Sequence, residues 1–204
     1  DGQLMYNIRE VFIKPGGSAA MEDYYPEYID ENVNIEINVK KPTEIGLVML
    51  SSTGTKQNTV GYFTYPTDQK PTDISQVTPI IAYPRISTAV CNSSSTAGSM
   101  YTGDRVELKY WDGTKFVNEF PAGVSIAWFL IESSYNQGTK EIMNNKRTFY
   151  SIRDLNKSKE HRTIALKNKS GEVVAFGMED ATNFEPTGDN TRKGNFGDAV
   201  FYLD

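Results

Sequence analysis

The feature that most constrains this chain is a two-residue alternation of apolar and polar side chains in short segments. In segment 33–39, four apolar residues alternate with polar ones: Val33, Ile35, Ile37 and Val39. Successive side chains of a strand point to opposite faces, so this pattern predicts a half-buried strand. Further short strands are predicted at 6–13, 45–50, 60–65, 80–83, 105–110, 124–131, 163–166, 173–178 and 199–203.

No long helical periodicity competes with this pattern. Segments 18–25 and 152–159 predict at most one or two short helices. About ten short strands separated by Gly, Pro and Asn are typical of an all-β protein, and we expect a jelly-roll-like β-sandwich. The segments least typical of strands, 65–75 and 91–102, are interpreted as loops and not as domain boundaries. One domain is therefore predicted over residues 1–204.

Composition excludes several classes of function. The chain carries 21 basic and 26 acidic residues, a net charge of −5, and so lacks the basic surface of a nucleic-acid binder. The single cysteine, Cys91, and the single histidine, His161, exclude an internal disulfide, Cys/His zinc sites and a two-histidine metal site. The longest apolar run, 126–131, is far shorter than the roughly 20 residues of a membrane-spanning helix.

A β-hairpin is predicted where Asp112-Gly113 follows segment 105–110, with the return strand at 115–117. Trp111 beside this turn is the best single candidate for an exposed aromatic that stacks on a sugar. The alternative is that Trp111 is a cross-strand partner of Phe116. Trp128, by contrast, lies inside the longest apolar run and is expected in the core.

A second aromatic candidate is a tyrosine cluster around Pro26 in an acidic segment. Tyr24, Tyr25 and Tyr28 are weak candidates for a platform that contacts a sugar or a partner chain. The alternative, which we favour, is that they pack as part of an N-terminal loop.

The C-terminal segment 173–204 carries most of the chemical information. Strand 173–178 runs directly into Glu179-Asp180, and Asp198 directly precedes strand 199–203. If these strands are antiparallel neighbours, the three carboxylates lie at one end of the pair. Asp189 lies in the long connection 181–197 between the two strands.

Carboxylates held close together repel one another, and a bound cation removes that cost. Calcium suits such a site because it accepts six to eight oxygens in irregular geometry. The alternative is a solvated acidic loop, for which Arg192 and Lys193 supply the counter-charges.

The same segment resembles the closing signature of a bacterial exoprotein domain, the domain of unknown function family 4114. The resemblance rests on these motifs in this order: Phe120–Gly123, Phe129–Ile131, Phe149–Ser151, Asn156, His161, Phe176–Asp180, Gly188-Asp189 and Asn195–Phe201. It covers about residues 103–204. Residues 1–102 loosely resemble the additional N-terminal β portion of the Bacteroides surface-lipoprotein version.

The resemblance implies a secreted or cell-surface β-sandwich with a calcium site at the acidic signature. Carried over by position, the metal ligands would be Glu179, Asp180, Asp189, Asn195 and Asp198. Asn195 stands where the family has an aspartate and would bind through its amide oxygen. Gly197 stands where the family has an asparagine and offers only its carbonyl oxygen. The resemblance also favours a structural role for His161.

The leading functional hypothesis is a non-catalytic, calcium-stabilised module that contacts a glycan or a surface protein in adhesion. It would lie outside the cell or on the outer-membrane surface, with its signal or lipid anchor outside this sequence. The alternative is a carbohydrate-binding accessory module with an aromatic contact face. A carboxylate-dependent hydrolase is less favoured, because Glu179 and Asp180 would point to opposite faces of a continuing strand. No catalytic residue is therefore assigned.

Overall fold

The computed structural model describes residues 35–52, 56–86, 102–157, 159, 161–167, 170, 173–180 and 196–204. The predicted strand at 6–13, the helix candidate at 18–25, Tyr24, Tyr25, Tyr28 and Cys91 lie outside these residues. The described part contains fourteen strands and two short 3-10 helices, η2 (Ile74–Gln76) and η4 (Arg153–Leu155). The protein is all-β, as predicted. Among the described residues, no helix has the length and apolar character needed to cross a membrane.

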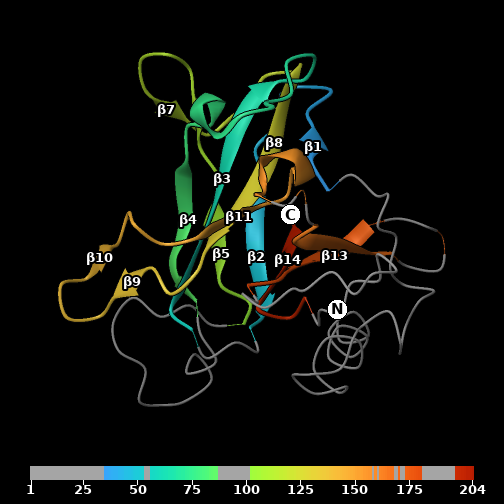
Figure 1. The fold of residues 1–204 in the computed structure, drawn as a ribbon. Helices are drawn as coiled ribbons and strands as arrows, with labels where there is room; N and C mark the ends of the chain where they lie inside the picture. Colours follow the sequence, from blue (N-terminus) through green and yellow to red (C-terminus); the bar gives the residue numbers. More distant parts are fainter. Residues whose placement is uncertain are drawn as a thin grey trace.

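The first of two large antiparallel sheets has the strand order β1-β8-β3-β4 (Figure 1). Its strands are β1 (Ile37–Asn38), β3 (Asn58–Pro66), β4 (Ile80–Ile86), β8 (Val124–Ile131) and β11 (Thr148–Tyr150). The short strands β1 and β11 pair with different parts of the long strand β8. Within segment 33–39, the described residues form a strand only at β1, although Ile35 and Val39 are buried as predicted.

The second large sheet has the order β12-β13-β14-β2-β5. Its strands are β2 (Gly46–Ser51), β5 (Arg105–Glu107), β12 (Thr163–Lys167), β13 (Val173–Met178) and β14 (Ala199–Leu203). Two small hairpins complete the described strands: β6 (Tyr110–Trp111) with β7 (Phe116–Val117), and β9 (Tyr135–Asn136) with β10 (Glu141–Ile142).

The two large sheets pack face to face on one aromatic core. Trp128 of β8 stacks on Phe176 of β13 with ring centroids 5.0 Å apart. Tyr83 of β4 stacks on Phe201 of β14 at 5.3 Å. These contacts join the inner faces of the two sheets, so the described residues form a β-sandwich. The chain passes between the sheets, from β2 to β3 and from β4 to β5, as a jelly-roll-like arrangement requires.

Strand β8 is apolar except for Ser125, because both of its faces are covered. Trp128 lies in the core between the sheets, whereas Phe129 belongs to a smaller cluster on the outer face with Phe63, Ile152 and Leu155. The segment that carries η4 therefore covers the outer face of the first sheet. Among the described residues of the helix candidate at 152–159, only this 3-10 turn is helical.

The predicted strand at 105–110 is wrong as one continuous element. Strand β5 ends at Glu107 and pairs with β2, and the chain then leaves the sheet to form β6. Lys109 marks the break, because its backbone N–H and C=O both bond to the Tyr62 hydroxyl instead of a neighbouring strand. The hairpin at Asp112-Gly113 is confirmed: Gly113 adopts φ 101°, and the Asp112 side chain accepts bonds from the backbone N–H groups of Thr114 and Lys115.

The pairing of β13 with β14 positions the acidic signature. The two strands are antiparallel neighbours, and Met178, the last residue of β13, is paired with Ala199, the first residue of β14. The residues that follow Met178 and precede Ala199 therefore lie at the same end of the sheet.

Candidate metal centre

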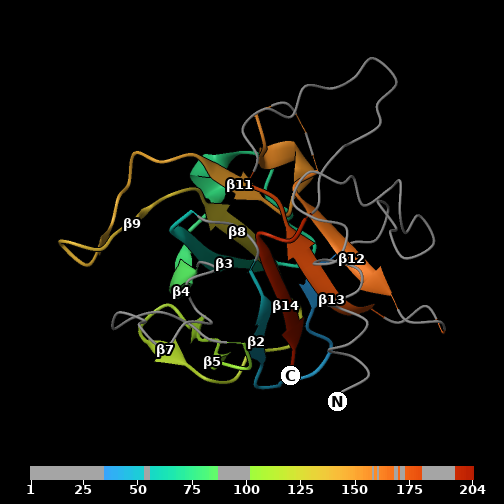
Figure 2. The same ribbon diagram turned by 90° about the horizontal axis from the view of Figure 1, so that it is seen from below.

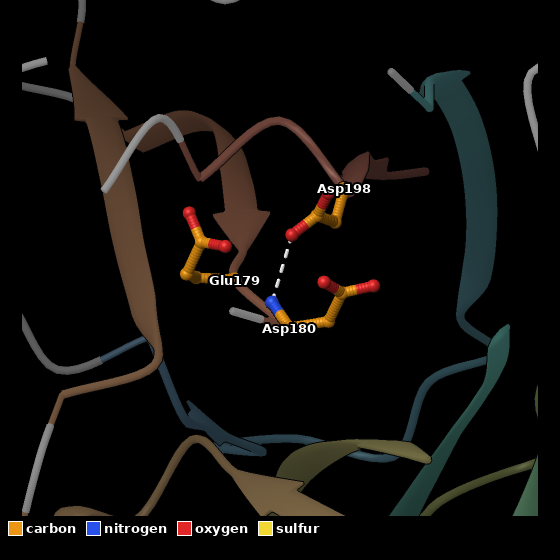
Figure 3. A group of neighbouring side chains, drawn as sticks. All are labelled: Glu179, Asp180 and Asp198. Atoms are coloured by element: carbon orange, nitrogen blue, oxygen red, sulfur yellow. Dashed lines mark hydrogen bonds between the residues drawn. The ribbon is translucent and has the colours of Figure 1, made fainter. Parts of the chain in front are cut away.

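Three carboxylates meet at this end of the second sheet. Glu179 and Asp180 follow β13, and Asp198 precedes β14 (Figure 3). All three residues are buried, with exposed fractions of 5%, 5% and 7%. Each offers an oxygen atom, and these atoms lie within 4.8 Å of one another. The predicted convergence of Glu179, Asp180 and Asp198 is therefore present.

The backbone explains why two consecutive residues reach one cluster. The N–H of Glu179 still donates to the carbonyl of Arg162, at 2.9 Å. The N–H of Asp180 instead donates to Oδ2 of Asp198 at 2.7 Å, as the dashed line in Figure 3 marks. Strand β13 has ended at Met178, so the expectation that Glu179 and Asp180 point to opposite faces of a continuing strand does not apply.

Phe196, which lies shortly before β14, binds the carboxylate of Glu179 through its backbone. Its N–H donates to Oε2 of Glu179 at 3.1 Å, and its side chain is fully buried. The residue has a φ of 48°, a left-handed conformation that is unfavourable for a side chain of this size. Core burial of the ring and the bond to the carboxylate together offset that cost.

Asp180 is held by residues that the sequence did not point to. Lys56 Nζ lies 2.8 Å from its Oδ1, and Asn58 Nδ2 donates to its Oδ2 at 2.5 Å. Lys56 also pairs with Glu132 at 2.7 Å, and Oδ1 of Asn58 accepts a bond from the N–H of Ser133. Asp180 is thus tied to the start of β3 and to the turn after β8.

No local signal marks Lys56, Asn58 or Glu132 as part of a site. Asn58 opens an otherwise ordinary strand, and Lys56 and Glu132 are single charged residues near strand ends. The pairing of β3 with β8 brings Glu132 to Lys56, which is 76 residues away in the chain. The packing of the two sheets brings Lys56 and Asn58 to Asp180, which lies more than 120 residues further along.

Burial and repulsion between the carboxylates raise the pKa of Asp198. Burial is the largest cause, followed by the charge and hydrogen bond of Glu179 and the charge of Asp180, and together they raise the pKa of Asp198 to about 9. For Lys56, burial alone would lower the pKa, but bonds and charges of Asp180 and Glu132 outweigh it and raise the pKa. At neutral pH the cluster therefore needs a proton or a further cation beside Lys56.

The donor set suits calcium. Within the described residues the cluster consists of carboxylates alone, which are ligands for hard cations. Calcium binds oxygens at about 2.3–2.6 Å, so two ligands on opposite sides of the ion lie about 5 Å apart. The three oxygen atoms lie within 4.8 Å of one another, so all three can reach one ion. Each carboxylate has several lone-pair positions, so Asp180 can bind a cation and keep its bonds to Lys56 and Asn58.

The remaining predicted site residues divide into two groups. Asp189 and Asn195 lie outside the described residues, as do the three tyrosines of the N-terminal cluster. Trp111 is exposed and pairs with Phe116 across the β6–β7 hairpin, so the cross-strand pairing is confirmed and the stacking on a sugar stays a prediction. His161 is half-buried, with its Nε2 3.3 Å from Arg153 Nη1, a contact that agrees with a structural role.

Comparison with known proteins found one family. Residues 120–204 match the sequence model of the family described as Domain of unknown function (DUF4114). Neither a curated protein nor a solved structure matched the chain. The matched region contains all three clustered carboxylates, and it excludes Lys56 and Asn58. The lipoprotein version of the family stays a prediction.

Proposed function

We propose that this chain, whose residues 120–204 match the DUF4114 family model, is a non-catalytic, calcium-stabilised module of a secreted or cell-surface protein. In this role it contacts a glycan or another surface protein in adhesion. One observation supports the proposed calcium site: three buried carboxylates present oxygen atoms within 4.8 Å of one another.

Calcium in this proposal has a structural role. It neutralises Glu179, Asp180 and Asp198, whose burial is otherwise costly because like charges in a poorly solvated place repel. It also joins the end of β13 to the start of β14. Asp189 and Asn195, from the connection between these strands, are proposed as further ligands through their side-chain oxygens.

The burial of the cluster favours this role over hydrolysis. A glycosidase needs a sugar to lie between its two carboxyl groups. Glu179, Asp180 and Asp198 are each at least nine-tenths buried, and two of them accept bonds from backbone N–H groups. These features support carboxylates that hold an ion or a proton rather than a substrate.

A second candidate function, a carbohydrate-binding accessory module, rests on a different observation. Trp111 and Phe116 expose large aromatic surfaces on one hairpin. This function is compatible with a structural calcium ion, since the hairpin and the acidic cluster are built from different strands.

Thermal unfolding tests the calcium site. After removal of metal with EDTA, the wild-type chain is heated in excess calcium and in excess EDTA. At 100 times the dissociation constant, a ligand of the native state adds about 2.7 kcal/mol. For a chain of this size we expect calcium to raise the melting temperature by roughly 5–10 °C. The same scan with magnesium should give a smaller shift, because magnesium demands a stricter octahedral geometry.

The matched variants are Asp198→Asn and Glu141→Gln. The amide of Asp198→Asn can still accept the bond from the Asp180 N–H, so the variant should fold and lose the calcium shift. Glu141 lies exposed on the β9–β10 hairpin, and Glu141→Gln should keep the shift in full. The proposal fails if the metal-free wild-type chain shows no shift in calcium, or if Asp198→Asn keeps it.

A further inference from the structure

The β6–β7 hairpin exposes an aromatic pair that the fold does not need for anchoring. Trp111 and Phe116 are 46% and 54% exposed, and their rings meet edge to face with centroids 5.1 Å apart. The hairpin is fixed from its other side, where Tyr110 packs on the fully buried Phe120. Asp112 closes its turn. The exposed pair is therefore free to serve as a contact surface.

A hollow of about 290 Å³ lies beside Phe116, between edges of the two large sheets. Its apolar wall comes from Ile80 and Ile81 of β4, the last strand of the first sheet. Its polar rim comes from Glu107 at the end of β5, from Lys109 and from Asn118. Figure 2 shows β4, β5 and β7 on the same side of the molecule.

A second hollow of about 280 Å³ lies on the Trp111 side of the hairpin. Tyr110, Thr64 and Thr78 also line it, and Ile80 lines both hollows. Each hollow is close to the lower limit of roughly 300 Å³ for a small-molecule site. Each therefore has room for one sugar ring, and both have an exposed aromatic ring in the wall.

The charges on the rim of the first hollow balance one another. Lys109 Nζ lies 3.8 Å from the Glu107 carboxylate and donates a hydrogen bond to Asn118 Oδ1. One positive and one negative group give no net charge, so the rim suits an uncharged ligand with many hydroxyl groups. An apolar wall with a few convergent polar groups is the usual composition of such a site.

We propose that the hollow beside Phe116 binds a neutral pyranose ring of a glycan. The C–H face of the sugar packs on Phe116, and its hydroxyl groups bond to Glu107, Lys109 and Asn118. Trp111 extends the aromatic surface to the next sugar unit. This inference rests on the proposed role in glycan contact and specifies its site, but it does not depend on the calcium ion.

The two tryptophans provide the test, because Trp111 is exposed whereas Trp128 is fully buried. Acrylamide should quench the fluorescence of Trp111 and spare that of Trp128. The full chain is titrated with a panel of neutral disaccharides: maltose, cellobiose, lactose, N-acetyllactosamine and chitobiose. We expect at least one of them to protect Trp111 from quenching. Phe116→Ala should weaken that binding about tenfold, since the stacked ring is lost.

Two further variants separate binding from folding. Lys109→Met keeps the length of the side chain but removes a hydrogen-bond donor, and it should also weaken the protection. Val173→Ala trims an exposed apolar residue on β13, far along the second sheet from β5, and should leave the protection unchanged. Binding that is insensitive to Phe116→Ala would overturn the inference. So would a panel in which no sugar protects Trp111.

The same samples distinguish failure of this inference from failure of the calcium proposal. Sugar protection measured in both calcium and EDTA reports on the hairpin, and the melting temperature without sugar reports on the acidic cluster. If a sugar protects Trp111 but calcium does not raise the melting temperature, the sugar site is supported and the calcium site is refuted. If calcium raises the melting temperature but no sugar protects Trp111, the calcium site is supported and the sugar site is refuted.

Discussion

Asp198 is the residue at which the requirements of fold and site conflict. Its Oδ2 caps the N–H of Asp180, which has no strand partner there. The same position buries a carboxyl group next to Glu179 and Asp180, and these causes raise its pKa to about 9. Without a cation, the folded chain therefore retains a proton on Asp198 at a pH where the unfolded chain has released it.

This conflict predicts the pH dependence of the metal-free protein. The pKa of Asp198 is raised on folding from 3.8 to about 9. The contribution of this group to the free energy of unfolding is therefore fully present below about pH 4, and it is lost as the pH rises toward 9. In EDTA, the free energy of unfolding contributed by this group should fall by up to about 1.4 kcal/mol per pH unit in that range. Urea unfolding at pH 5 and pH 8 measures it.

Asp198→Asn is the control for this measurement, because it removes the titrating group and keeps the hydrogen-bond acceptor. The difference in unfolding free energy between wild type and variant should change with pH in the direction stated. In excess calcium the trend should reverse, because the ion competes with the proton and binds better at higher pH. Parallel pH profiles for wild type and variant in EDTA would contradict the prediction.

At the scale of one element, strand β3 depends on the absence of a side chain at Gly61. A Cβ atom built there would lie 2.3 Å from Cζ of Phe129 and 2.4 Å from the carbonyl oxygen of Ile80. The first atom belongs to the outer-face cluster, and the second to the backbone of β4. Neither can move without disturbing a paired strand, so β3 can pass between β8 and β4 only with glycine at this position.

Gly61→Ala should therefore lower the free energy of unfolding by about 2–3 kcal/mol, as overpacking of a core does. Gly46→Ala is the matched control. The three heavy atoms nearest to its added Cβ all belong to the side chain of Arg105, which is exposed and can rotate away. Its cost should stay within about 0.5–1 kcal/mol. Urea unfolding of both variants makes the comparison, and equal losses would refute the packing argument.

At the scale of the whole molecule, both sheets combine strands from the two halves of the chain. Strand β3 pairs with β8 along residues Thr59–Pro66, and β14 pairs with β2. The family match at 120–204 contains β8 and β14 but neither of their partners β3 and β2. The matched region therefore contributes only part of each sheet, and the core is closed by strands that precede it.

We accordingly expect fragment 120–204 not to fold by itself. It would expose one edge of β8 and the apolar residues that pack on Val60, Tyr62 and Leu47 in the full chain. The full chain should unfold in one cooperative transition, as a single domain does. Thermal melts followed by circular dichroism, and the dispersion of amide signals in NMR spectra, report whether the fragment and the full chain are folded. A cooperative melting transition in the fragment would show that the matched region is a domain of its own.

The sequence by itself determined most of the strands and part of the site. Strands at 124–131, 173–178 and 199–203 follow from local apolar patterns, because strand formation and burial of one face are properties of neighbouring residues. Chain order was also enough to place Glu179, Asp180 and Asp198 together, since antiparallel neighbours bring the end of one strand beside the start of the next.

Only the tertiary structure decided how those carboxylates are held. Lys56 and Asn58 reach Asp180 through the packing of the two sheets, and Glu132 reaches Lys56 through the pairing of β3 with β8. These are contacts between distant segments, which no local pattern encodes. The break after Glu107 likewise depends on the Tyr62 hydroxyl, which comes from a strand of the other sheet. Burial of the cluster, and with it the raised pKa of Asp198, arises only when both sheets close around it.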